Sequence, residues 1–401
     1  MRQPEAFDVE LLRTADGITK VQDEWTRFLE ERAGDHNAFH HPDIIRHDLS
    51  ENVGVYTPFI LIMRRRGRIV GIAPWYIHQL RFPLKLGVIN IGRVPLRLLK
   101  LFGGSIVTDR EISPDSIARQ ALESARNWRS DFHVLALFDI PVTGELWQLV
   151  TQATNPVPGF RPIPATPEPI VKREIALPET FEVFLASLSS KKRNSLRRHE
   201  RDLMKQSDDT LTFDRITDPA DVPAYLGEVE QVYRRSWQGQ TMGGQRASES
   251  QTRFLQRVAE HGWFRSYIVR CNAAPVCYGL GYQYGGVYHG EDMAYDIEWR
   301  RCAPGNYMFI KLIEDLFDSD TPRMVEFGTG DNVFKQQFSN TMGAAQTIYL
   351  VPRGKLYGAS VIRTQRFIDR LYRFGHSTVS RLGIDRWVRE RIKRRKRAHS
   401  E

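Results

Sequence analysis

The residues best suited to hold an anionic ligand lie where a predicted strand meets a predicted helix, within residues 287–317. A helix N-terminus presents unpaired backbone N–H groups and a partial positive charge. Proline there leaves no N–H unpaired, glycine lets a ligand approach the backbone, and arginine adds charge-assisted donors. The junction contains Arg300, Arg301, Pro304, Gly305 and Asn306. The combination suits a phosphate or pyrophosphate, although an ordinary strand–helix turn with surface arginines is the alternative.

Carboxylates that could remove a proton from a nucleophile precede this junction. Glu291, Asp292 and Asp296 lie on the predicted strand, and Glu326 lies on the next one. Alternation places Glu291 on one face and both aspartates on the other. Asp296 is nearest the phosphate-type loop, where open α/β sheets gather their ligands. We therefore predict Asp296 as the general base or acceptor-orienting group and Glu326 as second choice; ion pairing with Arg300 or Lys335 is the alternative.

Other side chains are candidates for contact with the reactants. On the basic helix predicted at 191–206, Arg193 and Arg197 lie one turn apart and are predicted to grip a polar or anionic acceptor, or to form a solvated face. Trp237 is predicted to stack on a sugar or base, or else to pack in the core. Tyr295 and Tyr307 are weaker candidates for protonating a leaving group.

Several other chemistries find no support in the sequence. The chain lacks GxxxxGK[ST], HExxH and GxSxG motifs, and Val333 replaces the third glycine of a dinucleotide fingerprint that Gly328 and Gly330 would begin. Histidines such as His199 and His289 show no metal-ligand spacing, so we predict no metal. Three cysteines without CxxC spacing argue against disulfides and zinc, and favour a reducing cytoplasm.

The elements that must position these residues form two similar series. Residues 59–77 and 266–284 both indicate a strand, a short polar turn and a second strand with small residues. Helical patterns flank both hairpins. A proline-rich stretch at 155–169 indicates a linker between the two series. We interpret this as a duplication, although any two hairpins can look alike.

Charge is unevenly distributed along the 401 residues. From Val351 onward the chain has 15 basic and four acidic residues, a net charge of +11, whereas residues 1–350 have 42 basic and 44 acidic residues. A body of net charge −2 argues against wrapping nucleic acid. No apolar run approaches the ~18 residues of a membrane span, and the N-terminus lacks the apolar stretch of a secretory signal.

Four segments, in order, carry a resemblance to a known family: SKKRNSLRRHERDL (190–203), Ser236-Trp237, AYDIEWRRCAPGNYMFIKLIEDL (294–316) and EFGTGDNVFKQQFSN (326–340). They resemble GNAT (Gcn5-related) acetyltransferases of the CelD/BcsL cellulose-biosynthesis type, relatives of the FemAB peptidoglycan aminoacyltransferases. The resemblance implies an acyl-CoA co-substrate whose pyrophosphate sits on the loop before the helix.

The donor-binding residues that the resemblance implies are Arg301, Pro304, Gly305, Asn306 and Tyr307. The usual GNAT loop, Q/R-x-x-G-x-G/A, is not matched beyond its first residue, but the CelD/BcsL-like group has Pro-Gly here. The resemblance also makes Lys335, in a motif shared with Fem-type enzymes, a candidate for oxyanion or phosphate binding; a helix-surface lysine is the alternative. The predicted catalytic set is thus Asp296, Glu326 and Lys335, with Arg193, Arg197, Trp237 and Tyr295 on the substrate.

The predicted fold is α/β (α+β): tandem GNAT-like domains with mixed, mostly antiparallel sheets flanked by helices, and a basic helical tail. We expect an N-terminal domain at 1–165 without its own donor site, a C-terminal domain with the acyl-CoA site at 170–352, and a basic amphipathic tail at 353–401. If the first half is a spent copy, it should supply a wall of the acceptor cleft.

The predicted function is acyl transfer, with acetyl-CoA as the expected donor, to an amine or hydroxyl of a cell-envelope polysaccharide, its precursor or an amino sugar. The alternatives are a Fem-type aminoacyl-tRNA-dependent ligase and a non-catalytic envelope scaffold with a degenerate acyltransferase fold. The predicted partners are a small-molecule or glycan acceptor and no nucleic acid. The predicted location is the cytoplasm, with the inner membrane face as an alternative, because residues 358–401 suit an anionic membrane surface.

Overall fold

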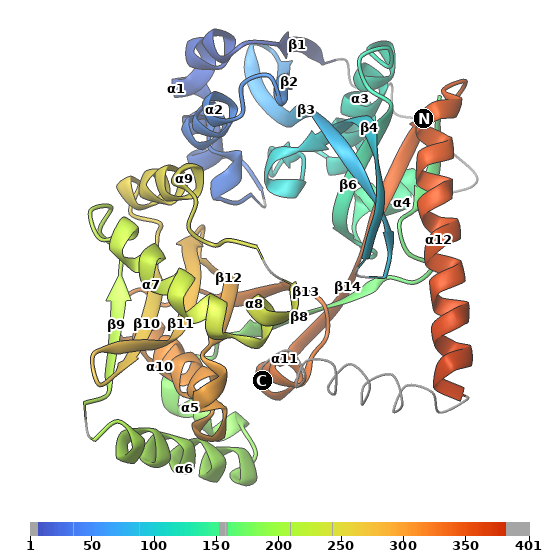
Figure 1. Ribbon diagram of the computed structural model, residues 1–401. Coiled ribbons are helices and arrows are strands. Elements are labelled where there is room, and N and C mark those ends of the chain that lie inside the picture. Colours follow the sequence, from blue (N-terminus) through green and yellow to red (C-terminus); the bar gives the residue numbers. More distant parts are fainter. Residues whose placement is uncertain are drawn as a thin grey trace.

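The computed structural model describes residues 7–381 except 35, 88, 152–156, 158, 209 and 243, with side chains described up to Arg373. The chain forms two halves that stand side by side and share one continuous sheet, while a long C-terminal helix runs along the first half (Figure 1). The rest of the predicted basic tail, 382–401, lies outside the described residues.

The first half, residues 7–164, places two helices before a long three-stranded meander and a third helix after it. Its elements are β1 (Asp8–Leu12), α1 (Ala15–Glu31), η1 (Ala38–His40), α2 (Pro42–Glu51), β2 (Tyr56–Arg65), β3 (Arg68–Leu86), β4 (Ile89–Leu101), η2 (Phe102–Gly104), β5 (Val107–Thr108), α3 (Pro114–Asn127), β6 (Val134–Pro141), α4 (Glu145–Thr151) and β7 (Phe160–Pro164).

The second half, residues 170–352, repeats this order after one strand and two helices, of which the second is basic, and α12 follows it. Its elements are β8 (Ile170–Ala176), α5 (Phe181–Ser187), α6 (Ser190–Gln206), β9 (Thr212–Ile216), α7 (Val222–Arg235), α8 (Trp237–Met242), α9 (Glu249–Glu260), β10 (Ser266–Cys271), β11 (Ala274–Tyr284), β12 (Val287–Tyr295), η3 (Ile297–Cys302), α10 (Pro304–Asp318), β13 (Met324–Thr329), α11 (Val333–Phe338) and β14 (Thr341–Pro352), followed by α12 (Leu356–Arg381).

The strand order confirms the predicted tandem fold. The sheet runs β1-β2-β3-β4-β6-β14-β8-β13-β12-β11-β10-β9, so each half contributes an antiparallel meander. The parallel pairs among the described strands are β4 with β6 and β12 with β13, each over three residue pairs, and a helix connects the strands of each pair. The halves meet where β14 pairs with both β6 and β8. The sheet is therefore mixed and mostly antiparallel, as predicted.

Separate apolar clusters anchor the two connecting helices to their strands. Ile117 and Leu122 of α3 are buried against β2, β3 and β6 in the first half. Met308, Leu312 and Leu316 of α10 are buried against β10, β11 and β13 in the second half. A buried helix face fixes the helix, and therefore its N-terminus, relative to the strand ends. Both helices thus hold their first turns at corresponding places.

Some elements differ from the sequence-based expectation. The proline-rich stretch predicted as a linker contains β7, which pairs with β14. β4, β8 and β9 were not predicted, because each is half-exposed and lacks a clear boundary in its sequence. Ser113 precedes α3, but its side chain makes no capping hydrogen bond. Helices in the described ranges are all too short or too polar to cross a bilayer.

Candidate functional site

The parallel strands β12 and β13 separate partway along their length. Their register runs from Val287 opposite Met324 to His289 opposite Glu326 and ends there. On its other side β13 pairs with β8 from Met324 to Thr329, so only this pairing continues beyond Glu326. The β11–β12 register also shifts between Gly290 and Asp292, which leaves Glu291 as a bulge that bends β12. The two strands therefore form a wedge that opens toward the N-terminus of α10.

The first turn of α10 has no side-chain cap. Its N-cap, Ala303, has a left-handed backbone (φ 48°) and no side chain that can accept a hydrogen bond, and no acidic residue lies in the first turn. Pro304 and Gly305 follow it and are buried. A left-handed residue other than glycine is strained, and such strain is common at ligand sites. The backbone N–H groups of Asn306 and Tyr307 bond to the Ala303 carbonyl, and phosphate binding at this loop stays a prediction.

A lysine from another helix lies beside this terminus. The ammonium of Lys192 on α6 donates to Asn306 Oδ1 at 3.3 Å and Gln337 Oε1 at 2.5 Å, and lies 4.2 Å from the centre of the Phe338 ring. Both acceptors are neutral, and burial lowers the pKa of Lys192 to about 8. A half-buried cation beside the positive end of a helix is stabilised by an anion. Lys192 therefore adds a positive charge that would favour a phosphate at this point.

The carboxylate of Asp296, our first choice as general base, is held by contacts within the protein. Its buried carboxylate caps η3 by accepting from the Glu298 N–H at 3.0 Å, and it lies 3.6 Å from Arg235 rather than pairing with Arg300. Asp296 follows His289, the register partner of Glu326, by seven residues, roughly 20 Å of extended strand. The structure therefore does not bring Asp296 and Glu326 together in one catalytic centre.

Glu326 lies at the closed end of the wedge between two basic side chains. It forms an ion pair with Lys172 of β8, and its Oε2 lies 2.8 Å from His289 Nδ1. Burial alone would raise the pKa of Glu326, but the hydrogen bond with His289 and the charge of Lys172 lower it to about 2. Such a carboxylate is a weak base but a good orienting group. It holds His289 with Nδ1 as donor and leaves Nε2 as the nitrogen that can accept a proton.

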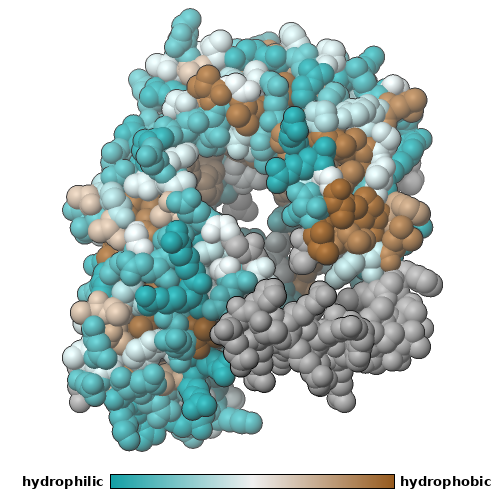
Figure 2. Space-filling view, viewed as in Figure 1, coloured by the Kyte–Doolittle hydropathy of each residue, from teal (hydrophilic) through white to brown (hydrophobic). Residues whose placement is uncertain are grey.

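A cleft of about 840 Å³ reaches Glu326 from the first half, and the surface between the halves is visibly hollowed (Figure 2). Most of its wall comes from the first half, including the N-terminus of α3 and the end of β6; the second half adds Lys172, Glu326, Gly328 and Thr329. Four carboxylates and two basic side chains line it: Asp109, Asp139, Glu145, Glu326, Arg110 and Lys172. Arg32 pairs with Asp109 and Lys172 pairs with Glu326, so Asp139, Glu145 and Arg110 leave the cleft with a small acidic excess. The cleft adjoins the wedge at Glu326.

The predicted acceptor-gripping arginines lie elsewhere. Arg193 donates to the carbonyls of Leu185, Ala186 and Leu188 at the end of α5, so it caps that helix. Arg193 and Arg197 line a groove of about 220 Å³ between α5, α6 and α10, together with Tyr307. The groove lies on the face of α10 that carries Lys311 and Glu314, apart from Glu326.

The remaining predicted residues surround the wedge. Lys335 Nζ donates to the carbonyls of Thr329 at 2.9 Å and Gly328 at 3.2 Å. These hydrogen bonds connect α11 to the end of β13. Trp237 is 59% exposed at the start of α8, and this helix contacts β12 through Gln238. Tyr295 is partly exposed and lies against Gly305. Arg301 is exposed on η3.

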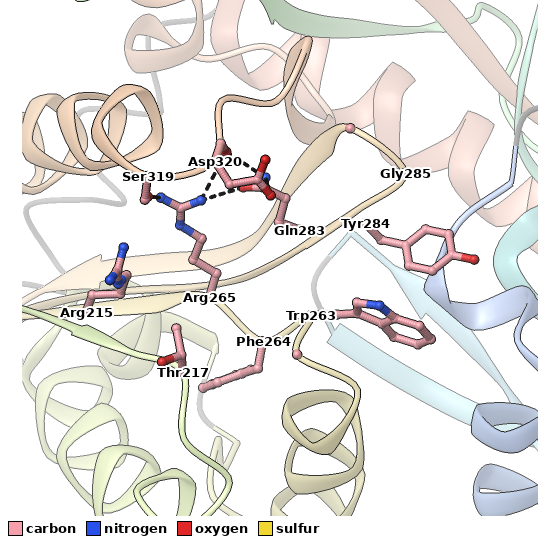
Figure 3. Close-up of a pocket in the computed structure, with 12 residues that line it drawn as sticks. Arg215, Thr217, Trp263, Phe264, Arg265, Gln283, Tyr284, Gly285, Ser319 and Asp320 are labelled. Atoms are coloured by element: carbon pink, nitrogen blue, oxygen red, sulfur yellow. Dashed lines mark hydrogen bonds between the residues drawn. The ribbon is translucent and has the colours of Figure 1, made fainter. Parts of the chain in front are cut away.

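A second pocket, of about 440 Å³, lies at the other end of α10 (Figure 3). Arg265 dominates it and donates to Asp315, Ser319, Gln283 and the Asp320 carbonyl. Arginine is suited to satisfy helix C-terminal carbonyls in this way. The N–H groups of Arg265 are hydrogen-bonded within the protein, so the role of Arg265 in this pocket is structural.

One group of residues in the described ranges has metal-ligand composition: His41, Asp43 and His261, whose ligand atoms lie within 4.8 Å of one another. Arg257, however, donates to both carboxylate oxygens of Asp43 at 2.6 and 2.8 Å, and His261 lies 2.8 Å from one of them. A guanidinium therefore occupies the place that a cation would need. The group joins α2 of the first half to α9 of the second.

Comparison with known proteins agrees with this architecture. Residues 190–336 match the model of the acetyltransferase (GNAT) domain family. The fold is similar to that of FemX, with 11% identity, a TM-score of 0.58, and coverage of 87% of this chain and 98% of FemX. L-PGS from Bacillus licheniformis gives 15% identity, a TM-score of 0.50, and coverage of 86% and 96%.

A third similar structure is the C-terminal domain (DUF2156) of a protein described as a lysylphosphatidylglycerol synthetase from Agrobacterium fabrum. It gives 12% identity, a TM-score of 0.50, and coverage of 86% of this chain and 95% of that chain. No curated protein sequence matches the chain significantly. The chain contains a GNAT-type acetyltransferase domain in a tandem fold, and the protein is an acyltransferase.

Sequence reasoning missed two residues that the geometry brings forward. Lys192 is one of seven basic residues on or beside α6, and only the packing of α6 against α10 distinguishes it from the others. His289 was set aside because it has no metal-ligand spacing. The signal that could have found it is its place on β12 opposite Glu326, which requires the β12–β13 register.

Proposed function

We propose that the protein transfers an acyl group from acyl-CoA, with acetyl-CoA as the expected donor, to an amine of a cell-envelope polysaccharide, its precursor or an amino sugar. The observation that carries the donor assignment is the uncapped N-terminus of α10 with Lys192 beside it. A cation and an open helix terminus at one point suit a diphosphate. Arg301, on the exposed side of the same loop, would add a second cation.

The acceptor would occupy the cleft between the halves. Its net acidic lining attracts an amine-bearing acceptor and repels a nucleotide or a polyanion. This selects the amine from the predicted pair of amine or hydroxyl. The cell-envelope acceptor and the CelD/BcsL type rest on the sequence resemblance.

The proposed chemistry places His289 at the reacting centre. Its Nε2 takes a proton from the acceptor ammonium or from the attacking amine, while Glu326 and Lys172 hold the ring in place. The amine nitrogen attacks the thioester carbonyl carbon, the C–S bond breaks, and the CoA thiolate leaves and takes up a proton. In this scheme Glu326 is a positioning residue, and Asp296 positions the donor loop through η3.

Calorimetry with acetyl-CoA, followed by a thiol-release assay with glucosamine as the probe acceptor, tests the proposal. We expect micromolar binding to one site per chain and release of CoA only when the amine is present. Absence of binding to acetyl-CoA or to longer acyl-CoAs would refute the donor assignment.

A Fem-type aminoacyl-tRNA-dependent ligase is the second candidate, supported by the similarity to FemX over 98% of that chain. The acidic cleft argues against it, because a tRNA end meets basic surfaces. Transfer from aminoacyl-tRNA but not from acetyl-CoA would favour this candidate.

A further inference from the structure

The β3–β4 hairpin extends beyond the core of the first half and ends in an apolar tip. β3 has 19 residues and β4 has 13, and burial along both strands falls toward the turn that joins them. At this tip Leu86 is 36%, Ile89 61% and Ile91 53% exposed. Isolated exposed apolar residues are ordinary, but a group at the end of a projecting hairpin marks a contact surface.

Helix α12 continues the same surface. Gln365 exchanges hydrogen bonds with the backbone of Lys85 at 2.8 and 2.9 Å, and Gly87 in the turn packs against the Tyr372 ring. The outward side of α12 presents Phe367, 61% exposed, and Leu371, 51% exposed. In the space-filling view, apolar atoms gather where the hairpin tip lies beside α12 (Figure 2). The two elements thus form one continuous apolar patch.

The charge around this patch has one sign. Residues 68–101, which form the hairpin, contain six Arg or Lys residues and no aspartate or glutamate. Residues 356–381 of α12 contain five arginines and one acidic residue, Asp369, which accepts a hydrogen bond from Gln365. Arg81, Lys85 and Arg93 on the hairpin and Arg363 and Arg370 on the helix are exposed. The rest of residues 1–350 has 36 basic and 44 acidic residues, a net charge of −8, so this concentration of positive charge is local.

From these observations we infer that the hairpin tip and α12 dock the protein on an anionic lipid bilayer surface. Apolar side chains that project from a basic rim enter the headgroup region, and the arginines contact anionic lipid phosphates. A second copy of the chain fits less well, because two such faces would oppose like charges. The interface is distinct from the acyl-transfer site, so this inference does not depend on the proposed function.

Sedimentation of the full chain with vesicles tests this inference. The vesicles are phosphatidylcholine alone, or phosphatidylcholine with about 30 mol% phosphatidylglycerol. We expect binding to the anionic vesicles that weakens as salt is raised. The variant I89D/I91D should bind about tenfold more weakly, since it removes the inserted residues and adds negative charge. V53D, which alters an 80% exposed valine before β2, is the matched control and should bind as the wild type does.

Charge reversal at R81E/R93E gives an independent readout, because it leaves the apolar tip intact. Circular dichroism melting confirms that each variant is folded. The inference is overturned if the full chain ignores anionic vesicles, or if folded I89D/I91D binds them as the wild type does. It is also overturned if light scattering shows a dimer that I89D/I91D dissociates, because the patch then belongs to a second copy.

Discussion

The N-termini of α3 and α10 occupy equivalent places in the two halves but have opposite electrostatics. Each helix connects two parallel strands over three residue pairs and begins with proline. The first turn of α3 contains Asp115, whose backbone N–H donates to Glu145 at 2.9 Å. The first turn of α10 has no carboxylate and has Lys192 beside it. A carboxylate thus already occupies one terminus, whereas the other has no carboxylate and has a lysine beside it.

In the proposed scheme, this difference divides one reaction between the two halves. The cleft near α3 is wide but acidic, which disfavours a diphosphate and favours an amine. The wedge beside α10 has the charge that a donor diphosphate needs. The half that lacks donor-binding charge would therefore serve as the acceptor wall, and the two proposed sites would meet near Glu326.

We expect the largest loss of activity at His289, beside Glu326. Replacing His289 with Ala should lower kcat about 10³-fold, because it removes the group that exchanges the proton. The matched variant E326Q should lower kcat about tenfold and broaden its pH profile, because it only loosens the orientation of the ring. The thiol-release assay measures both variants. Full activity in H289A would exclude His289 as the base.

Substitution of Lys192, beside the N-terminus of α10, should have the next largest effect. Lys192→Glu should weaken acetyl-CoA binding about 100-fold, because it places a second negative charge beside the diphosphate. Arg198→Glu makes the same change at an exposed place on the same helix and should have little effect. Calorimetry measures both. Equal losses in the two variants would mean that α6 acts only through its overall charge.

The sequence predicted the tandem fold and the strand–helix junction at Pro304 because both follow from local signals, whereas the role of this junction as the donor loop stays a prediction. Pro304 and Gly305 begin a helix after a strand, and hairpin patterns recur in both halves. The pairing of Lys192 with Asn306, and of His289 with Glu326, depends on tertiary contacts between distant segments. Asp296 was favoured for its place near the loop, but its side chain caps η3. Periodicity alone does not show which carboxylate faces the acceptor.

The pH dependence of acetyl-CoA binding further tests the difference between the N-termini of α3 and α10. Burial lowers the pKa of Lys192 to about 8, so its ammonium is present at pH 7 and lost as the pH rises through 8 and beyond. Acetyl-CoA affinity should therefore fall about tenfold between pH 7 and 9.5. Lys192→Met should bind more weakly at pH 7 and show little further change with pH. A wild-type affinity that stays constant to pH 9.5 would contradict this role.

The smallest effect concerns the connection between the halves. Asp43→Asn should lower the free energy of unfolding by about 1 kcal/mol, because it weakens the hydrogen bonds from Arg257 and His261. Hydrogen bonds from both partners lower the pKa of Asp43 to about 2, although burial alone would raise it. Its stabilisation is thus present above about pH 4 and lost as the pH falls toward 2.

Urea denaturation at pH 7 and at pH 3 measures the Asp43 effect. Glu51→Gln, which weakens a more exposed contact with Arg253 between the same two helices, is the control and should change stability less. An Asp43→Asn protein as stable as the wild type would show that the hydrogen bonds of Asp43 do not stabilise the contact between α2 and α9.

Hydrogen–deuterium exchange with and without acetyl-CoA tests the central claim most directly, because it reports on both helix N-termini in one sample. We expect acetyl-CoA to slow exchange at the first turn of α10, residues 303–308, and in the adjacent start of α6. Exchange at residues 113–118 of α3 should stay unchanged. Protection at α3, with none at α10, would assign the donor site to the first half and contradict the proposed division of roles.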